Sequence, residues 1–278
     1  MKLHTETIGH GPDIFLVHGW CLHSGVWGSI LPELAHSYRV TRVDLPGHGR
    51  SRGLSMPTTL PELAQLLLEV APQNAVWLGW SLGGLACQRA AMDFPGHLRA
   101  LVLVSTTPRF ITAADWPHAM PLEQLQALVT ELRDDYQKTV QRFLALQVRG
   151  DAAAHATLRQ LRTTLLSTGQ PSATDLERGL MLLRDSDVRA ELPHIHIPTL
   201  ILTGGYDRLI PVQASEFLAA AVHGAQSMVF PKAAHAPFLS SPMEFLIALR
   251  QFLQKLPVII PAQTCDHPQV SEHDKHRT

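Results

Sequence analysis

Gly79-Trp80-Ser81-Leu82-Gly83 joins an apolar run, residues 75–78, to a stretch with helical periodicity, residues 82–92. A serine on a sharp turn between a strand and a helix projects its hydroxyl out of the sheet. The flanking glycines let the strand and the helix approach more closely than a Cβ would allow. The pentapeptide therefore predicts a strand, a turn that presents a nucleophile, and a helix.

Short apolar runs typical of buried strands alternate with helical segments on both sides of this turn. Besides residues 75–78, the expected strands are 14–17, 40–44, 100–104, 198–203 and 227–230. Besides residues 82–92, the expected helices of this part of the fold are 60–70, 212–222 and 243–256. Continuous apolar strands separated by helices favour a parallel sheet that is covered on both faces. The predicted fold class is α/β, with a mostly parallel central sheet flanked by helices.

The strand signal disappears in the middle of the chain, between residues 109 and 189. Amphipathic helical stretches replace it at 122–132, 134–148, 152–166 and 174–183. We interpret this block as a helical lid, inserted at 109–190 between two parts of one core, 1–108 and 191–256. Residues 257–278 carry prolines, histidines and charges without periodicity, so we predict a disordered tail there.

The length and composition of the chain exclude some classes of function. The chain has 278 residues, 45% of them hydrophobic and 17% charged, which is enough to bury one large core. A net charge of -1 argues against a surface built throughout for nucleic acid or anionic membrane. No apolar stretch reaches the length of a membrane span, and the first residues lack the apolar segment of a secretory signal. We expect a cytoplasmic, monomeric protein that binds neither nucleic acid nor membrane.

The cysteines and histidines do not form a recognisable metal motif. Cys21, Cys87 and Cys265 include no C-x-x-C pair and are expected to be free thiols. The closest histidine groupings, His194-x-His196 and those of the tail, lack the spacing of zinc ligands. We therefore expect no metal and no cofactor.

Ser81 needs a base to accept its proton, and that base needs an acid to orient it. On a fold with this serine turn, the expected chain order is Ser, Asp, His. Asp207 follows the expected strand 198–203, and His235 lies in a loop after the expected strand 227–230. Because the carboxyl ends of parallel strands share one edge of a sheet, both side chains are expected beside the serine. We predict a catalytic triad of Ser81, His235 and Asp207.

Other readings of these residues stay open. Asp44 and Asp187 are alternative acids, although Asp44 precedes the serine and is expected to shape the rim of the site. Asp207 could serve only as a turn residue ahead of the helix that follows Pro211. His235 could be an ordinary polar or surface side chain.

Attack on an ester places negative charge on the carbonyl oxygen, which preorganised N–H groups can stabilise. One predicted donor is the N–H of Leu82, at the start of the helix after the serine, where the helix dipole favours an anion. The second is the N–H of Trp20, in the His18-Gly19-Trp20 turn after the expected strand 14–17. Alternatively, this turn only ends the strand and plays no part in binding an oxyanion.

From about Gly11 to Leu256, the chain resembles the α/β-hydrolase superfamily. His18-Gly19, the loop 44–51, the pentapeptide 79–83, Asp207 and His235 appear in the order of that superfamily. More narrowly, the sequence is similar to the carboxylesterases of biotin biosynthesis, which demethylate the methyl ester of pimeloyl-[acyl-carrier protein]. The stretches that carry this likeness are 18–20, 44–47, 49–53, 77–84, 142–147 and 233–238.

The resemblance implies a cofactor-free serine carboxylesterase with a Ser-His-Asp acyl-enzyme mechanism. It implies acyl-carrier protein as a partner, small esters as further substrates, and cations of the lid as the docking site. The implied substrate contacts are Trp20, Ser81, Leu82, Phe143, Gln147 and His235. The implied docking residues are Lys138, Arg142, Arg159 and Arg162.

The lid residues also have simpler explanations. Residues 133–162 contain six Lys or Arg against three Asp, a surplus that could steer an acidic partner or could be a solvated helix face. Phe143 could belong only to the core of the lid.

Three other functions use the same fold. They are a broad short-chain carboxylesterase or lactonase, a C–C bond hydrolase, and a ligand receptor without turnover.

Overall fold

The computed structural model describes residues 2–257 and has a seven-stranded sheet at its centre. The strand order is β1-β3-β2-β4-β5-β6-β7, and every neighbouring pair is parallel except β1 with β3. The strands are β1 Thr5–Ile8, β2 Asp13–Val17, β3 Arg39–Val43, β4 Ala75–Trp80, β5 Leu98–Val104, β6 Thr199–Gly204 and β7 Gln226–Phe230. The mostly parallel α/β sheet is confirmed. The tail predicted at 257–278 lies outside the described residues except for Pro257, and Cys265 lies outside them too.

Strand β1 is the one strand of this sheet that the sequence pattern did not predict. It has only four residues, Thr-Glu-Thr-Ile, without the apolar run of the inner strands. It pairs antiparallel with β3 at the edge of the sheet, where one side of a strand needs no apolar cover. Strands β4 and β6, in contrast, are buried along their whole length, which is why their apolar runs are clear in the sequence.

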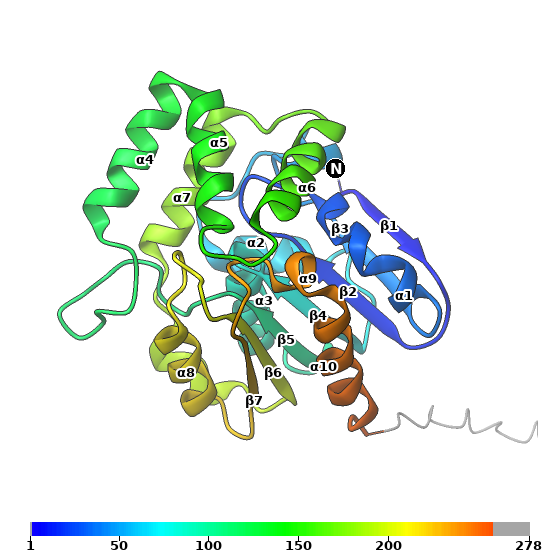
Figure 1. Cartoon of the computed structure of the whole chain (residues 1–278). Coiled ribbons are helices and arrows are strands. Elements are labelled where there is room, and N and C mark those ends of the chain that lie inside the picture. Colours follow the sequence, from blue (N-terminus) through cyan, green and yellow to red (C-terminus); the bar gives the residue numbers. More distant parts are fainter. Residues whose placement is uncertain (1, 258–278) are drawn as a thin grey trace, which may run out of the picture.

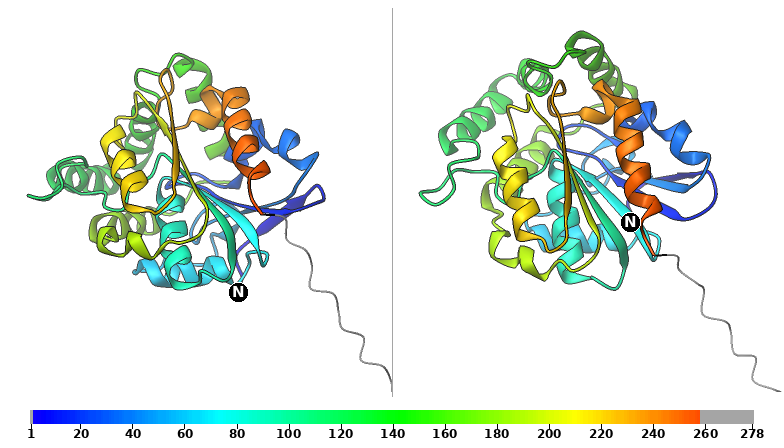
Figure 2. Two further views of the ribbon diagram at one scale, coloured as in Figure 1. Left: turned by 90° about the horizontal axis from the view of Figure 1, so that it is seen from below. Right: turned by 60° about the horizontal axis from the view of Figure 1, so that its bottom comes forward.

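Helices cover both faces of the sheet, as Figure 2 shows. α1 Leu31–Ala35 and α10 Pro242–Gln254 lie on one face, and α2 Leu60–Leu68 and α3 Leu82–Asp93 lie on the other. The remaining helices of this part of the fold are α8 Val212–Ala221, which packs against β6 and β7, and the single turn α9 Pro237–Ser240. The short helices α1 and α9 were not predicted, since one turn is too short to show a periodicity.

Four helices between β5 and β6 gather at one end of the sheet (Figure 1). They are α4 Leu122–Asp134, α5 Tyr136–Gln147, α6 Ala154–Ser167 and α7 Ala173–Asp185, and we call residues 122–185 the insert. The helix predicted at 134–148 begins later, at Tyr136, because the Asp135 side chain accepts a hydrogen bond from the Lys138 N–H and caps α5.

Candidate active site

Ser81 lies on a strained turn between β4 and α3. Its backbone has φ 55° and ψ -120°, a conformation that L-residues rarely adopt. Its N–H donates to the Val104 carbonyl over 3.0 Å, and the Thr106 hydroxyl donates to the Ser81 carbonyl over 2.8 Å. A Cβ on Gly83 would collide with the His18 carbonyl, so only glycine lets α3 start this close to β2. The turn leaves Ser81 partly exposed at the end of the sheet.

Asp207 and His235 form a buried pair. The His235 Nδ1 lies 2.7 Å from the Asp207 Oδ2, and the two side chains are 2% and 0% exposed, respectively. The other carboxylate oxygen of Asp207 accepts the N–H groups of Leu209 and Ile210, each over 2.9 Å. Asp207 is therefore both a turn residue and the partner of the histidine. An ionised carboxylate only accepts, so Nδ1 carries the proton and Nε2 is left as a base.

Trp80 connects the histidine to the serine turn. Its indole N–H donates to the His235 carbonyl over 2.7 Å, and the two rings lie 5.4 Å apart. Within residues 2–257 the Ser81 hydroxyl makes no hydrogen bond to the His235 ring. Catalytic hydrogen bonds are often long in a protein without substrate and tighten when substrate binds. The three residues predicted as a triad thus lie at one end of the sheet, with one of their two mutual contacts formed.

Two backbone N–H groups beside Ser81 are available to an oxyanion. In the described part of the chain, neither the Trp20 nor the Leu82 N–H donates to another protein group. Gly19 packs directly on the serine turn, since a Cβ placed there would lie 3.1 Å from the Ser81 Cβ. Unsatisfied donors in such a buried place are rare and suit a ligand with negative charge.

Two buried histidines shape the Gly19-Trp20-Cys21 turn. The His18 ring donates to the Gly19 carbonyl and accepts the Leu45 N–H, while the His48 ring accepts the Cys21 N–H over 3.2 Å. Burial and the neighbouring His48 lower the pKa of His18 to about 3, so its ring is neutral, as this pattern of one donated and one accepted hydrogen bond requires. Cys21 adopts φ 73°, a left-handed backbone conformation that was not predicted. A supporting role for His48 was not predicted.

Trp20 is also held by the insert. Its indole N–H donates to the Leu176 carbonyl over 2.8 Å, and its ring packs edge-on against Phe143 at 4.6 Å. Gly179 of α7 lies so close that a Cβ on it would be 2.7 Å from the Trp20 ring. The predicted substrate residue Phe143 therefore touches a predicted oxyanion residue.

Phe143 also lines a groove of about 390 Å³ between α4 and α5. Its lining residues are Met120, Gln124, Ala127, Leu128, Arg142, Phe143, Leu146 and Arg149. Neither Trp20 nor Ser81 lines the groove, but Phe143 contacts both the groove and the Trp20 ring. The groove combines apolar walls with two arginines at the surface.

Gln147, the other predicted substrate residue of the insert, is buried at the end of α5. Its backbone carbonyl accepts the His235 N–H over 3.0 Å. Its side-chain oxygen has no hydrogen-bond partner among the described residues. A buried polar atom without a partner is costly, and a bound ligand could satisfy it.

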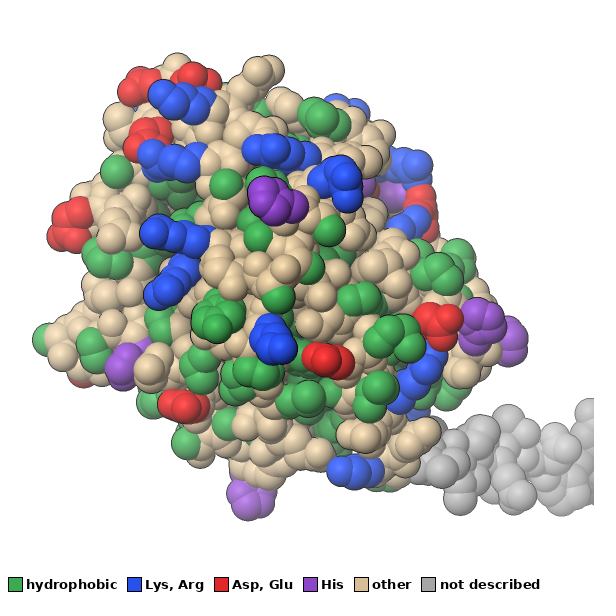
Figure 3. All heavy atoms as spheres, in the orientation of Figure 1, with side chains coloured by type: hydrophobic (Ala, Val, Ile, Leu, Met, Phe, Trp, Pro, Cys, Tyr) green, Lys and Arg blue, Asp and Glu red, His purple; other side chains and the backbone are tan. Residues whose placement is uncertain are grey.

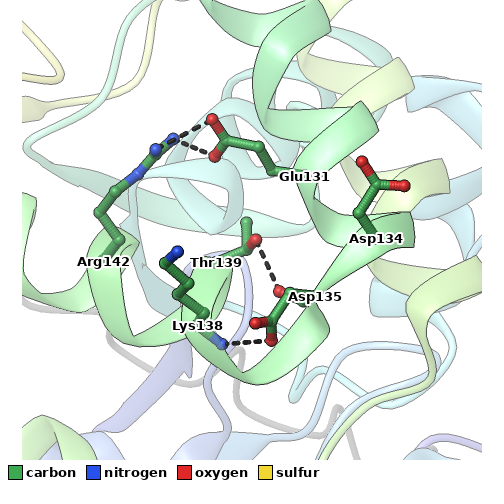
Figure 4. Close-up of a pocket in the computed structure, with 6 residues that line it drawn as sticks. All are labelled: Glu131, Asp134, Asp135, Lys138, Thr139 and Arg142. Atoms are coloured by element: carbon green, nitrogen blue, oxygen red, sulfur yellow. Dashed lines mark hydrogen bonds and ion pairs between the residues drawn. The ribbon is translucent and has the colours of Figure 1, made fainter.

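The four predicted docking cations differ in their surroundings. Figure 3 shows Lys and Arg side chains spread over the upper part of one face, above α5 and α6, with acidic side chains toward α4. Figure 4 shows Arg142 turned toward Glu131, with which it forms an ion pair, while the Lys138 ammonium has no such partner. Across residues 2–257, Lys138, Arg159 and Arg162 form no ion pair and are exposed. The charge of Arg142 is thus locally neutralised.

The alternative acids are used elsewhere. Asp44 accepts the N–H groups of Ser24 and Arg50, which fixes the loop beside the Trp20 turn. Asp187 lies in ion pairs with Arg189 and Arg109, and the hydrogen bond from Arg189 lowers its pKa to about 2.

The described residues include no group of three or more His, Cys, Asp or Glu side chains placed to hold a metal ion. No helix among them is both long and apolar enough to cross a membrane. Cys21 and Cys87 are free and buried, and burial raises the pKa of both thiols.

The chain is similar to known proteins in sequence and in fold. The alpha/beta hydrolase fold family matches residues 12–242. The chain is 42% identical over 255 residues to a pimeloyl-[acyl-carrier protein] methyl ester esterase of Xanthomonas oryzae, covering 92% of this chain and all of that protein. An enzyme of the same name from Edwardsiella ictaluri is 42% identical, over 89% of this chain and 95% of its own length.

Solved structures give the same fold. An esterase from Exiguobacterium antarcticum superposes with a TM-score of 0.83 at 22% identity, covering 91% of this chain and 95% of its own. An enol-lactonase from Burkholderia xenovorans superposes with a TM-score of 0.80, also at 22% identity, covering 91% of this chain and 96% of its own. At this identity, the likeness concerns the fold alone.

Proposed function

This chain belongs to the α/β-hydrolase fold family, and we propose that it is a serine carboxylesterase that hydrolyses the methyl ester of pimeloyl-[acyl-carrier protein]. One observation carries the proposal. Ser81 lies on a strained turn beside the buried Asp207–His235 pair, in a chain that matches enzymes named for this reaction along their whole length. Acyl-carrier protein is the proposed partner, biotin biosynthesis the proposed pathway, and the cytoplasm the proposed compartment.

The proposed first half-reaction transfers the acyl group to Ser81. The Ser81 Oγ attacks the ester carbonyl carbon while Nε2 of His235 takes the hydroxyl proton. Asp207 stabilises the resulting imidazolium through its 2.7 Å contact with Nδ1. The N–H groups of Trp20 and Leu82 hold the oxyanion, after which the C–O bond breaks and methanol leaves with the proton from His235.

In the second half-reaction, water takes the place of methanol. His235 removes a proton from the water, the hydroxide attacks the acyl carbon, and the bond to the Ser81 Oγ breaks. The proton returns to Ser81, and the product is the free carboxylic acid, still attached to its carrier at the far end. The active site therefore ends as it began and needs no cofactor.

The insert supplies a route for a tethered acyl chain. The methyl ester lies at the opposite end of the pimeloyl chain from the carrier protein, so the chain must pass from the surface to Ser81. The groove along Phe143, Leu146 and Leu128 offers it apolar walls, and Phe143 reaches Trp20. The unpaired cations Lys138, Arg159 and Arg162 lie on the same insert, where an acidic carrier protein could be steered.

A broad short-chain carboxylesterase is the second candidate. The observation that favours it is the neutralisation of basic residues on the insert: Arg142 pairs with Glu131, and Arg133 pairs with Glu177. Both pairs reduce the positive field that a carrier protein would meet.

The test compares a carrier-bound ester with free esters. We expect the purified protein to hydrolyse pimeloyl-[acyl-carrier protein] methyl ester with a higher kcat/KM than dimethyl pimelate or p-nitrophenyl acetate. Ser81→Ala should abolish all three activities while the circular dichroism spectrum stays unchanged. Equal kcat/KM values for the carrier-bound and free esters would favour the second candidate, and retained turnover in Ser81→Ala would overturn both.

A further inference from the structure

The turn between α5 and α6 of the insert is hydrogen-bonded to the loop that carries His235. We call residues 147–153 the insert turn and residues 231–236 the base loop. The His235 N–H donates to the Gln147 carbonyl over 3.0 Å, and the Ala152 N–H donates to the Lys232 carbonyl over 3.0 Å. The third bond runs from the Ala234 N–H to the Asp151 carboxylate over 3.1 Å. Segments far apart in the chain thus share three hydrogen bonds beside the predicted base.

Asp151 is the one residue whose side chain takes part in these three hydrogen bonds. It is 7% exposed, and its second oxygen accepts the Ala153 N–H of its own turn over 2.7 Å. Among residues 2–257 no cation forms an ion pair with it. A carboxylate buried without a counter-charge is costly, and here its only described compensation comes from two backbone N–H groups. One of these groups belongs to the insert turn and the other to the base loop.

The core holds the opposite side of the base loop. The Tyr206 N–H donates to the Ala233 carbonyl over 2.9 Å, and Gly204 lies directly beneath the Ala234 carbonyl, where a Cβ would not fit. Ala233, Ala234 and Ala236 are buried and have no polar side chain that could hold the loop. The Ala233–Ala234 peptide is therefore held by the Tyr206 N–H on one side and by Asp151 on the other. The next peptide, between Ala234 and His235, lies between Gly204 and the Gln147 carbonyl.

We propose that Asp151 is a positioning residue, which fixes the Ala234–His235 backbone so that the imidazole meets both Asp207 and Ser81. Because Asp151 belongs to the insert, the placement of the general base then depends on the insert turn being in position. A substrate or partner that contacts α5 next to this turn can affect the base through the same hydrogen bonds. The inference rests on the proposed esterase activity.

The main test is the kinetics of Asp151→Ala on p-nitrophenyl acetate, a small ester that does not need the docking surface. We expect kcat to fall about tenfold with KM changed by less than about twofold, since a small displacement of a catalytic group lowers the rate of the chemical step. Asp151→Asn keeps one acceptor oxygen and should retain more activity than Asp151→Ala. Asp185→Ala is the matched control, because the side chain of this exposed aspartate of the insert hydrogen-bonds, within residues 2–257, only with Arg184. The kcat of this variant should equal that of the unaltered protein.

A second variant separates positioning from general loosening of the fold. If Asp151 acts through the His235–Asp207 pair, its loss should matter little once that pair is broken, so Asp151→Ala should cost less than about twofold in an Asp207→Asn background. The same tenfold loss in both backgrounds, or an unchanged kcat in Asp151→Ala, would overturn the inference. If Asp151→Ala does not fold, Asp151→Asn is compared in the two backgrounds, and an equal effect in both has the same meaning. Absence of esterase activity in the unaltered protein would instead overturn the proposed function.

Discussion

The sheet and the insert hold the residues of the candidate active site in different ways. In the sheet, side chains are fixed by short-range features: Ser81 by a tight turn after β4, and Asp207 by the N–H groups of Leu209 and Ile210. The insert acts on the same site through long-range contacts, from Leu176 to Trp20 and from Asp151 to Ala234. A single substitution at a residue held by a local turn of the sheet should therefore abolish catalysis. A substitution at a contact made by the insert should only change the rate of catalysis.

The largest effect is expected in the sheet, at Asp207. Asp207→Asn should lower kcat by about 10³- to 10⁴-fold with little change in KM, because the amide no longer holds the His235 ring in its productive tautomer. Esterase kinetics on p-nitrophenyl acetate measure this. Asp187→Asn is the control, since among the described residues the Asp187 side chain bonds only to two partly exposed arginines and to the backbone N–H of Arg189. Equal losses in the two variants would remove Asp207 from the triad.

The buried ring of His18 should make the stability of the core depend on pH. Its folded pKa of about 3 lies below the reference value of 6.5, so the unfolded chain binds a proton that the folded chain does not. This contribution to stability is complete above pH 6.5 and declines as the pH falls toward 3, by up to about 1.4 kcal/mol per pH unit.

Denaturant unfolding at pH 7 and pH 5 measures the effect. His18→Asn should be less stable at pH 7 but should lose less stability between the two values than the unaltered protein does. The exposed His10 provides the control, as His10→Asn should leave the pH dependence unchanged. An identical pH dependence in His18→Asn would contradict a neutral, buried His18.

A smaller effect is expected where the insert meets Trp20. Gly179→Ala would place a Cβ 2.7 Å from the Trp20 ring. The ring must then shift, and we expect the backbone N–H of Trp20, the predicted oxyanion donor, to be displaced with it. We expect kcat to fall about tenfold, less than the 10²- to 10³-fold that removal of an oxyanion donor costs, because the donor is displaced and not deleted. Gly96→Ala, where a Cβ meets nothing within 4 Å, should be unaffected. An unchanged kcat in Gly179→Ala would show that the insert does not influence the turn that carries the Trp20 N–H.

The smallest effect is expected from the exposed cations of the insert, and only for the carrier-bound ester. Reversing the charge of Lys138, Arg159 and Arg162 together should lower kcat/KM for that substrate about fivefold at low salt, because steering acts mainly on the rate of encounter. Added salt should shrink the difference. Free esters should be hydrolysed as before, and reversal of Lys2, Arg184 and Lys255 should change neither activity. Equal losses on both kinds of ester would exclude a docking role.

The sequence was sufficient for most of the sheet and for the expectation that Ser81, Asp207 and His235 lie at one end of it. Inner strands such as β4 and β6 are buried on both faces, so their apolar runs are visible without a structure. The Ser81, Asp207 and His235 positions followed from strand ends and chain order. Only the edge strand β1, short and polar, escaped this reasoning.

The contacts between the insert and the rest of the site could not be predicted from strand ends and chain order. Trp20 and Leu176 are 156 positions apart, and Asp151 and Ala234 are 83 apart, so no local pattern connects them. The pairing of Arg142 with Glu131 depends on how α4 and α5 pack, which helical periodicity alone does not specify. The amphipathic pattern predicted which residues form the helices of the insert, but not which residues of the core these helices contact.

The central claim, that Ser81 is an activated nucleophile, is tested most directly by covalent labelling. The folded protein is treated with a fluorophosphonate, and the adduct is located by mass spectrometry of its peptides. We expect one adduct, on Ser81, which forms much more slowly in Asp207→Asn and is absent in Ser81→Ala. A folded protein that acquires no adduct, or that is labelled on another residue while Ser81 stays free, would contradict this account.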